Sequence, residues 1–223
     1  MAKKSLKVVS KASMKRIHTQ PDLSPRALVL ACAEGLLGQL ILNARLGFSD
    51  MTTELPLHQT VQTIAAARGY HHHHEYPVSK KKVKGDFERL DFVFTKLAPK
   101  PKKADGSDNF SIAIALEMKV VGRSSRNKPR KVSVDRRIKR QPYKDVTKDI
   151  SKIRSFLTET VNEHAIPLAS GYLMVVNLDI DSGIQWDMAK AGNTKANSVV
   201  LLNRYVYTNG PVRKSVTVYE VGV

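Results

Sequence analysis

Three charged side chains in two neighbouring segments have the types and spacing of a hydrolytic metal site. Glu117 and Lys119 stand two residues apart in an extended segment, so both point to one face of a strand. Asp91 lies in an earlier extended segment and can reach the same face if the two segments pair. Two carboxylates suit a hard divalent cation such as Mg²⁺, which takes oxygen ligands and keeps positions for water and phosphate. The three residues therefore indicate metal-assisted hydrolysis, in which Lys119 positions or deprotonates the attacking water.

The first of the two segments has the alternation of a strand. Residues 89–94 (RLDFVF) place Leu90, Phe92 and Phe94 on one face and Asp91 on the other. The aromatic face is expected to enter the core, which leaves Asp91 on the opposite face of the sheet.

The second segment, residues 111–121, alternates in the same way and puts Ala113 and Ala115 on the face of Glu117. Small apolar residues on that face predict that a helix, rather than water, covers it. A polar loop over residues 96–109 is expected to join the two segments into an antiparallel hairpin.

Further helices and strands are expected around the hairpin. Ser24 as N-cap and Pro25 at the first helical position begin a helix that ends near Gly47. Apolar positions recurring every three or four residues predict a second amphipathic helix over residues 145–164. Other strands are predicted over 70–78, over 171–180 and, as a pair turning at 208–211, over 198–223. We expect one α/β domain of residues 21–223.

A carboxylate on the first helix is a further candidate ligand. With about 100° of rotation per residue and Leu30 at zero, Leu37 and Ile41 lie within about 20° of Leu30, and Glu34 lies near about 40°. Glu34 is therefore expected on the buried face of this helix. It either joins the metal site or reaches a basic partner at the edge of the apolar stripe, and the sequence leaves both open.

Together these features resemble the PD-(D/E)XK nuclease superfamily, which has the restriction-endonuclease-like fold. The matching pieces are Asp91 in RLDFVF and Glu117-Met118-Lys119 in IAIALEMKVV, and the element order agrees with the αβββαβ core of that family. The likeness covers about residues 24–180 and departs from the family pattern in lacking a proline before Asp91. It implies a mixed central sheet flanked by helices, with the C-terminal strands as a β extension.

The resemblance implies a metal-dependent deoxyribonuclease that hydrolyses DNA phosphodiester bonds and leaves 5′-phosphate and 3′-hydroxyl ends. Asp91, Glu117 and the backbone carbonyl of Met118 are then the expected ligands of Mg²⁺ or Mn²⁺. Glu34 matches a position at which many members carry a further acidic ligand, either direct or through water. Lys119 is expected to complete the catalytic set by orienting the water.

Other residues of chemical interest have less specific spacing. Asp149 and Lys152 resemble a D-x-x-K pattern often seen on the second core helix of the family. Glu75 is either an outer member of the site or an edge residue. The run His71 to His74 alternates faces on a strand, so at most two rings converge, and phosphate or surface contact is expected rather than zinc. Cys32 is the only cysteine, which excludes a disulfide scaffold.

The charge of the chain predicts a polyanionic partner. The 223 residues include 37 Lys+Arg and 20 Asp+Glu, a net charge of +17, and the pI is about 10. Residues 1–20 form a basic arm, and further basic runs over 80–84, 96–103 and 123–144 flank the ends of the predicted site strands. We expect DNA contacts from the following side chains: Lys80, Lys81, Lys82, Lys84, Arg123, Arg126, Lys128, Arg130, Lys131, Arg136, Arg137, Lys139 and Arg140.

Composition also bounds the class and location of the protein. The longest apolar run, Ala27 to Ala33, is far below the roughly 20 residues that cross a bilayer, and no signal peptide is recognised, so we expect a cytoplasmic or nucleoid-associated protein without membrane contact. A homodimer or larger nucleoprotein assembly is compatible with this interpretation. The alternatives are a catalytically idle nuclease-fold component of a larger nucleoprotein complex, which binds DNA or RNA, and a basic structural or ribosome-associated protein.

Overall fold

The computed structural model describes residues 24–47, 54–83, 86–103, 108–121, 146–161, 165–178, 199–209 and 212–223. In chain order the elements are α1 (Pro25–Arg45), α2 (Glu54–Ala67), β1 (His71–Val83), β2 (Asp86–Lys102), β3 (Asp108–Val121), η3 (Phe156–Thr160), β4 (Leu168–Asn177), β5 (Val199–Asn209) and β6 (Val212–Val221). Residues 146–155 are α-helical and continue into the π-helical turn η3. We call residues 146–161 the crossover helix, because they connect β3 to β4.

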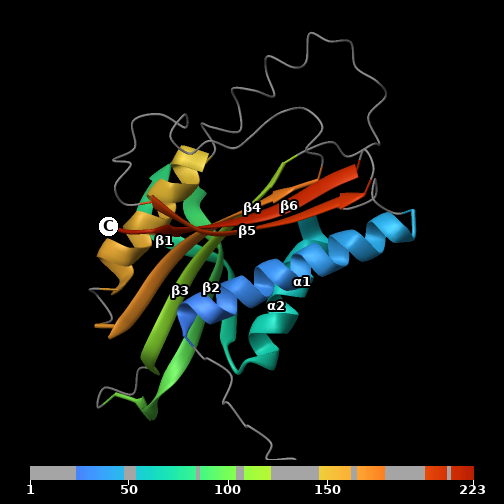
Figure 1. Cartoon of the computed structure of the whole chain (residues 1–223). Helices are drawn as coiled ribbons and strands as arrows, with labels where there is room; N and C mark the ends of the chain where they lie inside the picture. The colour runs from blue at the N-terminus through green and yellow to red at the C-terminus, as the bar shows by residue number, and fades with distance from the viewer. Residues whose placement is uncertain are drawn as a thin grey trace, which may run out of the picture.

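The strands form one mixed six-stranded sheet in the order β1-β2-β3-β4-β6-β5. The β2–β3 hairpin is antiparallel, as predicted, whereas β3 and β4 are parallel because the crossover helix returns the chain to the same end of the sheet. The C-terminal strands β5 and β6 join the same sheet as an antiparallel pair (Figure 1). The expected α/β class with a mixed sheet flanked by helices is confirmed.

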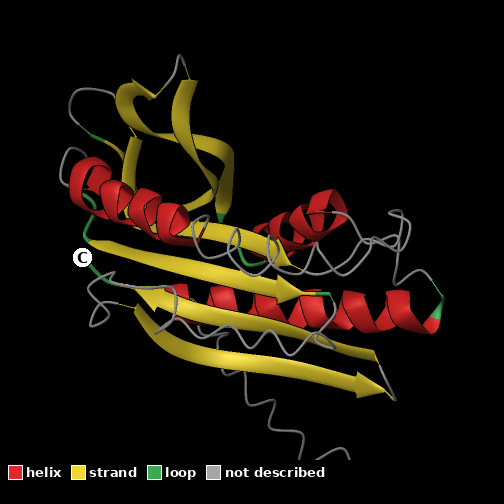
Figure 2. Cartoon of the chain, turned by 90° about the horizontal axis from the view of Figure 1, so that it is seen from above, coloured by secondary structure: helices red, strands yellow, loops and turns green. Residues whose placement is uncertain are grey.

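Helices cover both faces of the sheet. On β4, Tyr172 and Met174 belong to a core shared with α1 and α2, whereas Leu173 and Val175 belong to a core shared with the crossover helix. Successive side chains of a strand point to opposite faces, so α1 and α2 lie on one face and the crossover helix on the other (Figure 2). We call these the α1 face and the crossover face.

The first helix begins and ends as its sequence predicts. The Ser24 hydroxyl accepts a hydrogen bond from the Ala27 amide at 3.2 Å, Pro25 is the first helical residue, and Gly47 has a positive φ of 76° after the last turn. The helix is also long and apolar enough to span a membrane, with a mean hydropathy of 1.7. In this fold its buried side chains, Leu36 and Leu40 among them, pack against the sheet.

Two features differ from the sequence prediction. Most of the expected loop over 96–109 is strand, since Leu97 pairs with Phe110 and Lys102 with Asp108, so the hairpin reaches far beyond its neighbours (Figure 1). A two-stranded ribbon in solvent needs no apolar face. The polar sequence of residues 96–109 therefore indicated a loop although most of it forms strands. The second helix, α2, was not predicted at all, although its buried residues Leu57, Val61 and Ala65 recur every four positions.

Candidate active site

The third strand presents the two residues of the predicted E-x-K motif on the crossover face. Glu117 is 2% exposed, and the side chain of Lys119 is 28% exposed. Ala113 and Ala115, four and two residues before Glu117, pack in the core of the crossover face. The expectation that a helix covers this face is therefore correct, and it explains how a carboxylate comes to be buried there.

Asp91 lies beside this motif on the neighbouring strand. The last pair of the β2–β3 ladder is Phe92 with Leu116, so one further step places Asp91 opposite Glu117. The Oδ2 atom of Asp91 accepts a hydrogen bond from the backbone amide of Met118 at 2.8 Å. The two carboxylates predicted to meet are therefore neighbours, and the charge of Asp91 raises the pKa of Glu117.

The β1–β2 pair changes face at Asp91, which corrects the predicted alternation. Phe92 belongs to the core of the α1 face, but Leu90 belongs to the core of the crossover face, although the two were expected to point the same way. On β1, His74 packs on Phe92 and Tyr76 packs on the crossover helix, and Glu75 between them has φ 55°. The left-handed backbone conformation of Glu75 turns β1 locally. The paired strand β2 turns with it and separates from β3 at Asp91.

The crossover helix adds two charged groups to the site. The Nζ atom of Lys152 lies 2.6 Å from Oε1 of Glu117 and 3.2 Å from Oδ1 of Asp149. The other oxygen of Asp149, Oδ2, lies 3.9 Å from Nζ of Lys119. Three carboxylates and two ammonium groups therefore converge from β2, β3 and the crossover helix. The sequence showed the D-x-x-K pattern, but not that it would meet the E-x-K motif.

Burial controls the protonation of this cluster. Removal from water raises the pKa of Glu117 to about 9, reinforced by Asp91 and opposed by Lys152. Removal from water also raises the pKa of Asp149, against the effect of Lys152 and Lys119. The pKa of Lys152 is raised, because the neighbouring carboxylates outweigh the burial that favours its neutral form. Lys152 is thus a cation at neutral pH, whereas Glu117 needs more positive charge beside it than Lys152 supplies to be ionised there.

Glu34 is not part of this cluster, and its expected position on the buried face is wrong. Leu28, Cys32, Leu36 and Leu40 form the buried stripe of α1, whose centre lies about 180° around the helix from Glu34. Glu34 is exposed, and its Oε1 accepts a hydrogen bond from the Tyr205 hydroxyl at 3.2 Å. The helix also packs on the opposite face of the sheet from Glu117. Glu34 therefore lies outside the candidate metal site.

The remaining candidates have other surroundings or lie outside the described residues. Glu75 is half-exposed and pairs with Arg89 at 3.7 Å on the rim of the site. His74 contacts His58 of α2, with 3.2 Å between Nε2 and Nδ1, on the α1 face and away from the carboxylates. Lys80, Lys81 and Lys82 belong to β1, but their side chains are not described, and the following candidates lie outside the described residues: Lys84, Arg123, Arg126, Lys128, Arg130, Lys131, Arg136, Arg137, Lys139 and Arg140.

The oxygen atoms of the site fit a hard cation. Within the described part of the chain, no group of three or more His, Cys, Asp or Glu side chains is arranged so that it could hold a metal ion by itself. Instead, an ammonium group stands between Glu117 and Asp149 and also donates to the carbonyl of Arg89 at 3.1 Å. These oxygens already hold one cation, and carboxylate and carbonyl oxygens are the ligands that Mg²⁺ and Mn²⁺ take.

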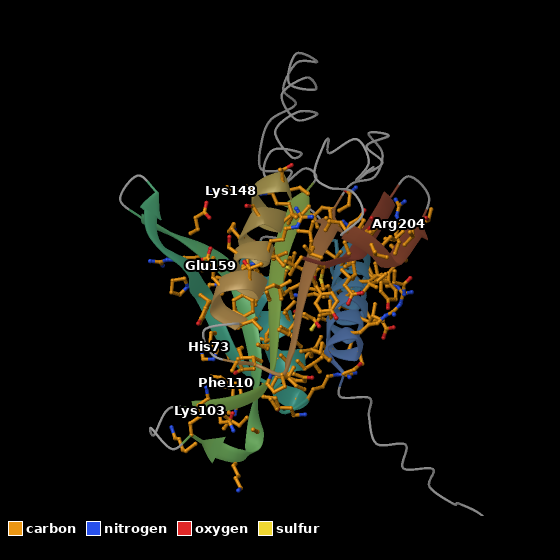
Figure 3. All side chains as sticks on the ribbon, turned by 90° about the vertical axis from the view of Figure 1, so that its left-hand side faces the viewer. His73, Lys103, Phe110, Lys148, Glu159 and Arg204 are labelled. Carbon is orange, nitrogen blue, oxygen red and sulfur yellow. The ribbon has the colours of Figure 1, made fainter. Side chains whose placement is uncertain are left out.

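The crossover helix and the far edge of the sheet are well separated, as the positions of Lys148 and Arg204 show (Figure 3). The charged cluster takes Asp149 and Lys152 from that helix, shortly after Lys148. Comparisons with known proteins add no relative, because no family model, curated protein or solved structure matches the chain.

Proposed function

We propose that the protein is a metal-dependent deoxyribonuclease with the restriction-endonuclease-like PD-(D/E)XK fold. The observation that carries the proposal is the meeting of Asp91 and Glu117 beside the amide of Met118, where β2 leaves β3. Lys119 follows two residues later on the same face of β3 and lies near Asp149. The element order supports it: α1, three antiparallel strands, the crossover helix and the parallel strand β4 follow the αβββαβ order, with α2 and the β5–β6 pair as additions.

Each group of the site has a role in hydrolysis of a phosphodiester. Asp91, Glu117 and the carbonyl of Met118 would hold Mg²⁺ or Mn²⁺. That carbonyl points to the β2 side, because the N–H and C=O of one strand residue face the same neighbour. The bound ion supplies Lewis-acid stabilisation of the phosphate charge. Lys119, partly exposed and held near Asp149, orients the attacking water.

The charge distribution supports DNA as the substrate. The segment 122–144 contains ten Lys and Arg residues and one acid, Asp135. In the chain it directly follows β3, which carries Glu117 and Lys119, and it leads into the crossover helix. A polyanion bound by this segment is thereby tethered to the elements of the site. An endonuclease acting on cytoplasmic or nucleoid DNA, alone or as a homodimer, agrees with this arrangement.

Cleavage of DNA by matched variants tests the function. Wild-type protein with Mg²⁺ or Mn²⁺ should cut plasmid and single-stranded DNA, and EDTA should stop the reaction. Lys119→Ala should lose most of the activity, since it removes the water-positioning group. Arg204→Ala is the control, because it removes one exposed positive charge at the far edge of the sheet (Figure 3). Equal activity of wild type and Lys119→Ala would show that the site is misassigned.

A second candidate function is a nucleic-acid-binding component of a larger complex with an idle site. The specific observation in its favour is that Lys152 bridges Glu117 and Asp149 within the chain itself. Such a protein would bind DNA or RNA with a log affinity that falls by about 0.9 per phosphate contact on duplex DNA as log salt rises, yet ignore divalent cations. Calorimetric titration with Mn²⁺ separates the two functions, since only the nuclease binds the ion, and Asp91→Asn should abolish that binding.

A further inference from the structure

The ammonium group of Lys152 is held by oxygens from three elements. Its Nζ donates to Oε1 of Glu117 at 2.6 Å and to the carbonyl of Arg89 on β2 at 3.1 Å, and it lies 3.2 Å from Oδ1 of Asp149. The side chain of Lys152 is 13% exposed, and that of Glu117 is 3% exposed. The most buried acidic side chain of the site is therefore hydrogen-bonded to an ammonium group that belongs to the chain itself.

We propose that Lys152 is a displaceable counter-ion of the metal site, a role that rests on the proposed function. In the metal-free protein the ammonium group of Lys152 is hydrogen-bonded to Glu117. This hydrogen bond must break when a divalent cation binds the carboxylate of Glu117. A Mg²⁺ ion needs its oxygen ligand at about 2.0–2.1 Å, and a second cation hydrogen-bonded to the same group would repel it strongly in this partly buried place. The two cations therefore compete for Glu117.

The surroundings of Lys152 allow this exchange without leaving a buried charge alone. Asp149 stands three residues earlier on the same helix and keeps a carboxylate within reach of the displaced ammonium group. The four-carbon stem of lysine is flexible, so its head can move while the helix stays in place. Glu117 then exchanges the ammonium group of Lys152 for the divalent ion. At no stage is a buried carboxylate left without a positive charge beside it, which would be unfavourable. The consequence is that Lys152 lowers the apparent affinity of the site for metal.

Metal binding by a charge-removing variant tests the counter-ion role. Lys152→Met keeps the unbranched stem of the side chain and removes its charged end. In calorimetric titration with Mn²⁺, without nucleic acid and at one pH and ionic strength, we expect this variant to bind at least about tenfold more tightly than wild type. Lys148→Met is the matched control, because it removes one exposed charge from the same helix (Figure 3). Its Mn²⁺ affinity should stay within about twofold of wild type.

Two further measurements make the outcomes separable. Lys152→Gln keeps a hydrogen-bond donor for Glu117 and replaces Lys152→Met if circular dichroism shows that the latter does not fold. If wild type binds Mn²⁺, Asp91→Asn abolishes the binding and the Lys152 variants bind no more tightly than wild type, the counter-ion role is overturned and the nuclease proposal stands. If neither wild type nor any Lys152 variant binds Mn²⁺, the metal site itself is refuted. Binding by the Lys152 variants alone supports the role in its strongest form.

Discussion

The carboxylate of Asp91 replaces a backbone acceptor for the amide of Met118. Its Oδ2 lies 2.8 Å from the amide nitrogen, just past the last β2–β3 pair of Phe92 with Leu116. Asp91 thereby ends the hydrogen-bond ladder of the hairpin and keeps a negative charge beside Glu117. One side chain thus serves both the fold and the proposed metal site, and the two contributions can be separated by substitution.

Asp91→Asn and Asp91→Ala should differ in stability but not in metal binding. The asparagine oxygen can still accept from the Met118 amide, whereas alanine leaves that part-buried amide without its acceptor, at a cost of about 1–3 kcal/mol. Neither variant supplies the charge for Mn²⁺. We expect urea unfolding in EDTA to show Asp91→Ala as the less stable variant, and calorimetry to show that neither binds the ion. Equal stability of the two variants would mean that the hydrogen bond contributes nothing.

Glu117→Gln should stabilise the metal-free protein increasingly as pH rises. The pKa of Glu117 is raised to about 9, so between its ordinary value of 4.5 and about 9 the folded state holds a proton that the unfolded state has released. The contribution of this group to stability is therefore complete at low pH and is lost as pH rises toward 9, with a slope of at most about 1.4 kcal/mol per pH unit. Glutamine does not titrate and removes this loss.

Urea unfolding of both proteins in EDTA at pH 5, 7 and 9 measures the effect. The variant keeps a side-chain oxygen as acceptor for Lys152, so the comparison isolates the titration of Glu117. The difference in unfolding free energy between variant and wild type should grow with pH. A constant difference across the range would show that Lys152 keeps Glu117 ionised throughout.

The central pairing of the site was predictable because it depends on strand geometry alone. Glu117 and Lys119 share a face by the period of two, and pairing of two adjacent strands brings Asp91 opposite Glu117. Ala113 and Ala115 on the face of Glu117 indicated that a helix covers this face. Local rules of this kind need no knowledge of the rest of the fold.

The parts that failed depend on how whole elements pack. The apolar residues of α1 surround much of the helix, so the sequence did not reveal which stripe faces the sheet. Glu34 lies about 180° from the centre of the stripe that does. The meeting of Lys152 with Glu117 depends on the rotation and depth of the crossover helix. The β1–β2 pair changes face at Glu75 and Asp91 because Glu75 adopts a left-handed backbone conformation. No sequence rule predicts this conformation for a glutamate.

Cys32 should be unreactive until the protein unfolds. Its thiol is fully buried in α1, lies 3.9 Å from the carbonyl of Val61, and burial raises its pKa to about 12, so almost no thiolate forms at pH 8. As Cys32 is the only cysteine, a thiol reagent such as Ellman's reagent reports on it alone. We expect no colour in native buffer and one equivalent in guanidinium chloride. Rapid labelling of the native protein would contradict the packing of α1.

Gly171→Ala tests how closely the crossover helix approaches the sheet beside the site. A Cβ at Gly171 would lie 2.2 Å from Cγ2 of Ile153, 3.0 Å from Cδ1 of Leu157 and 3.3 Å from the carbonyl oxygen of Val221. The helix must shift to admit the methyl group, which costs about 1–3 kcal/mol. Lys152, the neighbour of Ile153, shifts with it, so the Mn²⁺ affinity should change as well as the stability.

Gly38→Ala is the matched control for this prediction. Gly38 lies on α1, a Cβ there meets nothing within 4 Å, and alanine is the better helix former, so this variant should be more stable by up to about 1 kcal/mol. Urea unfolding of the two variants should therefore move in opposite directions. Replacing Ile153 by alanine in the Gly171→Ala protein makes room for the new methyl group, and the pair should lose less stability than the sum of its single variants. Additive losses would show that the helix does not rest on Gly171 through Ile153.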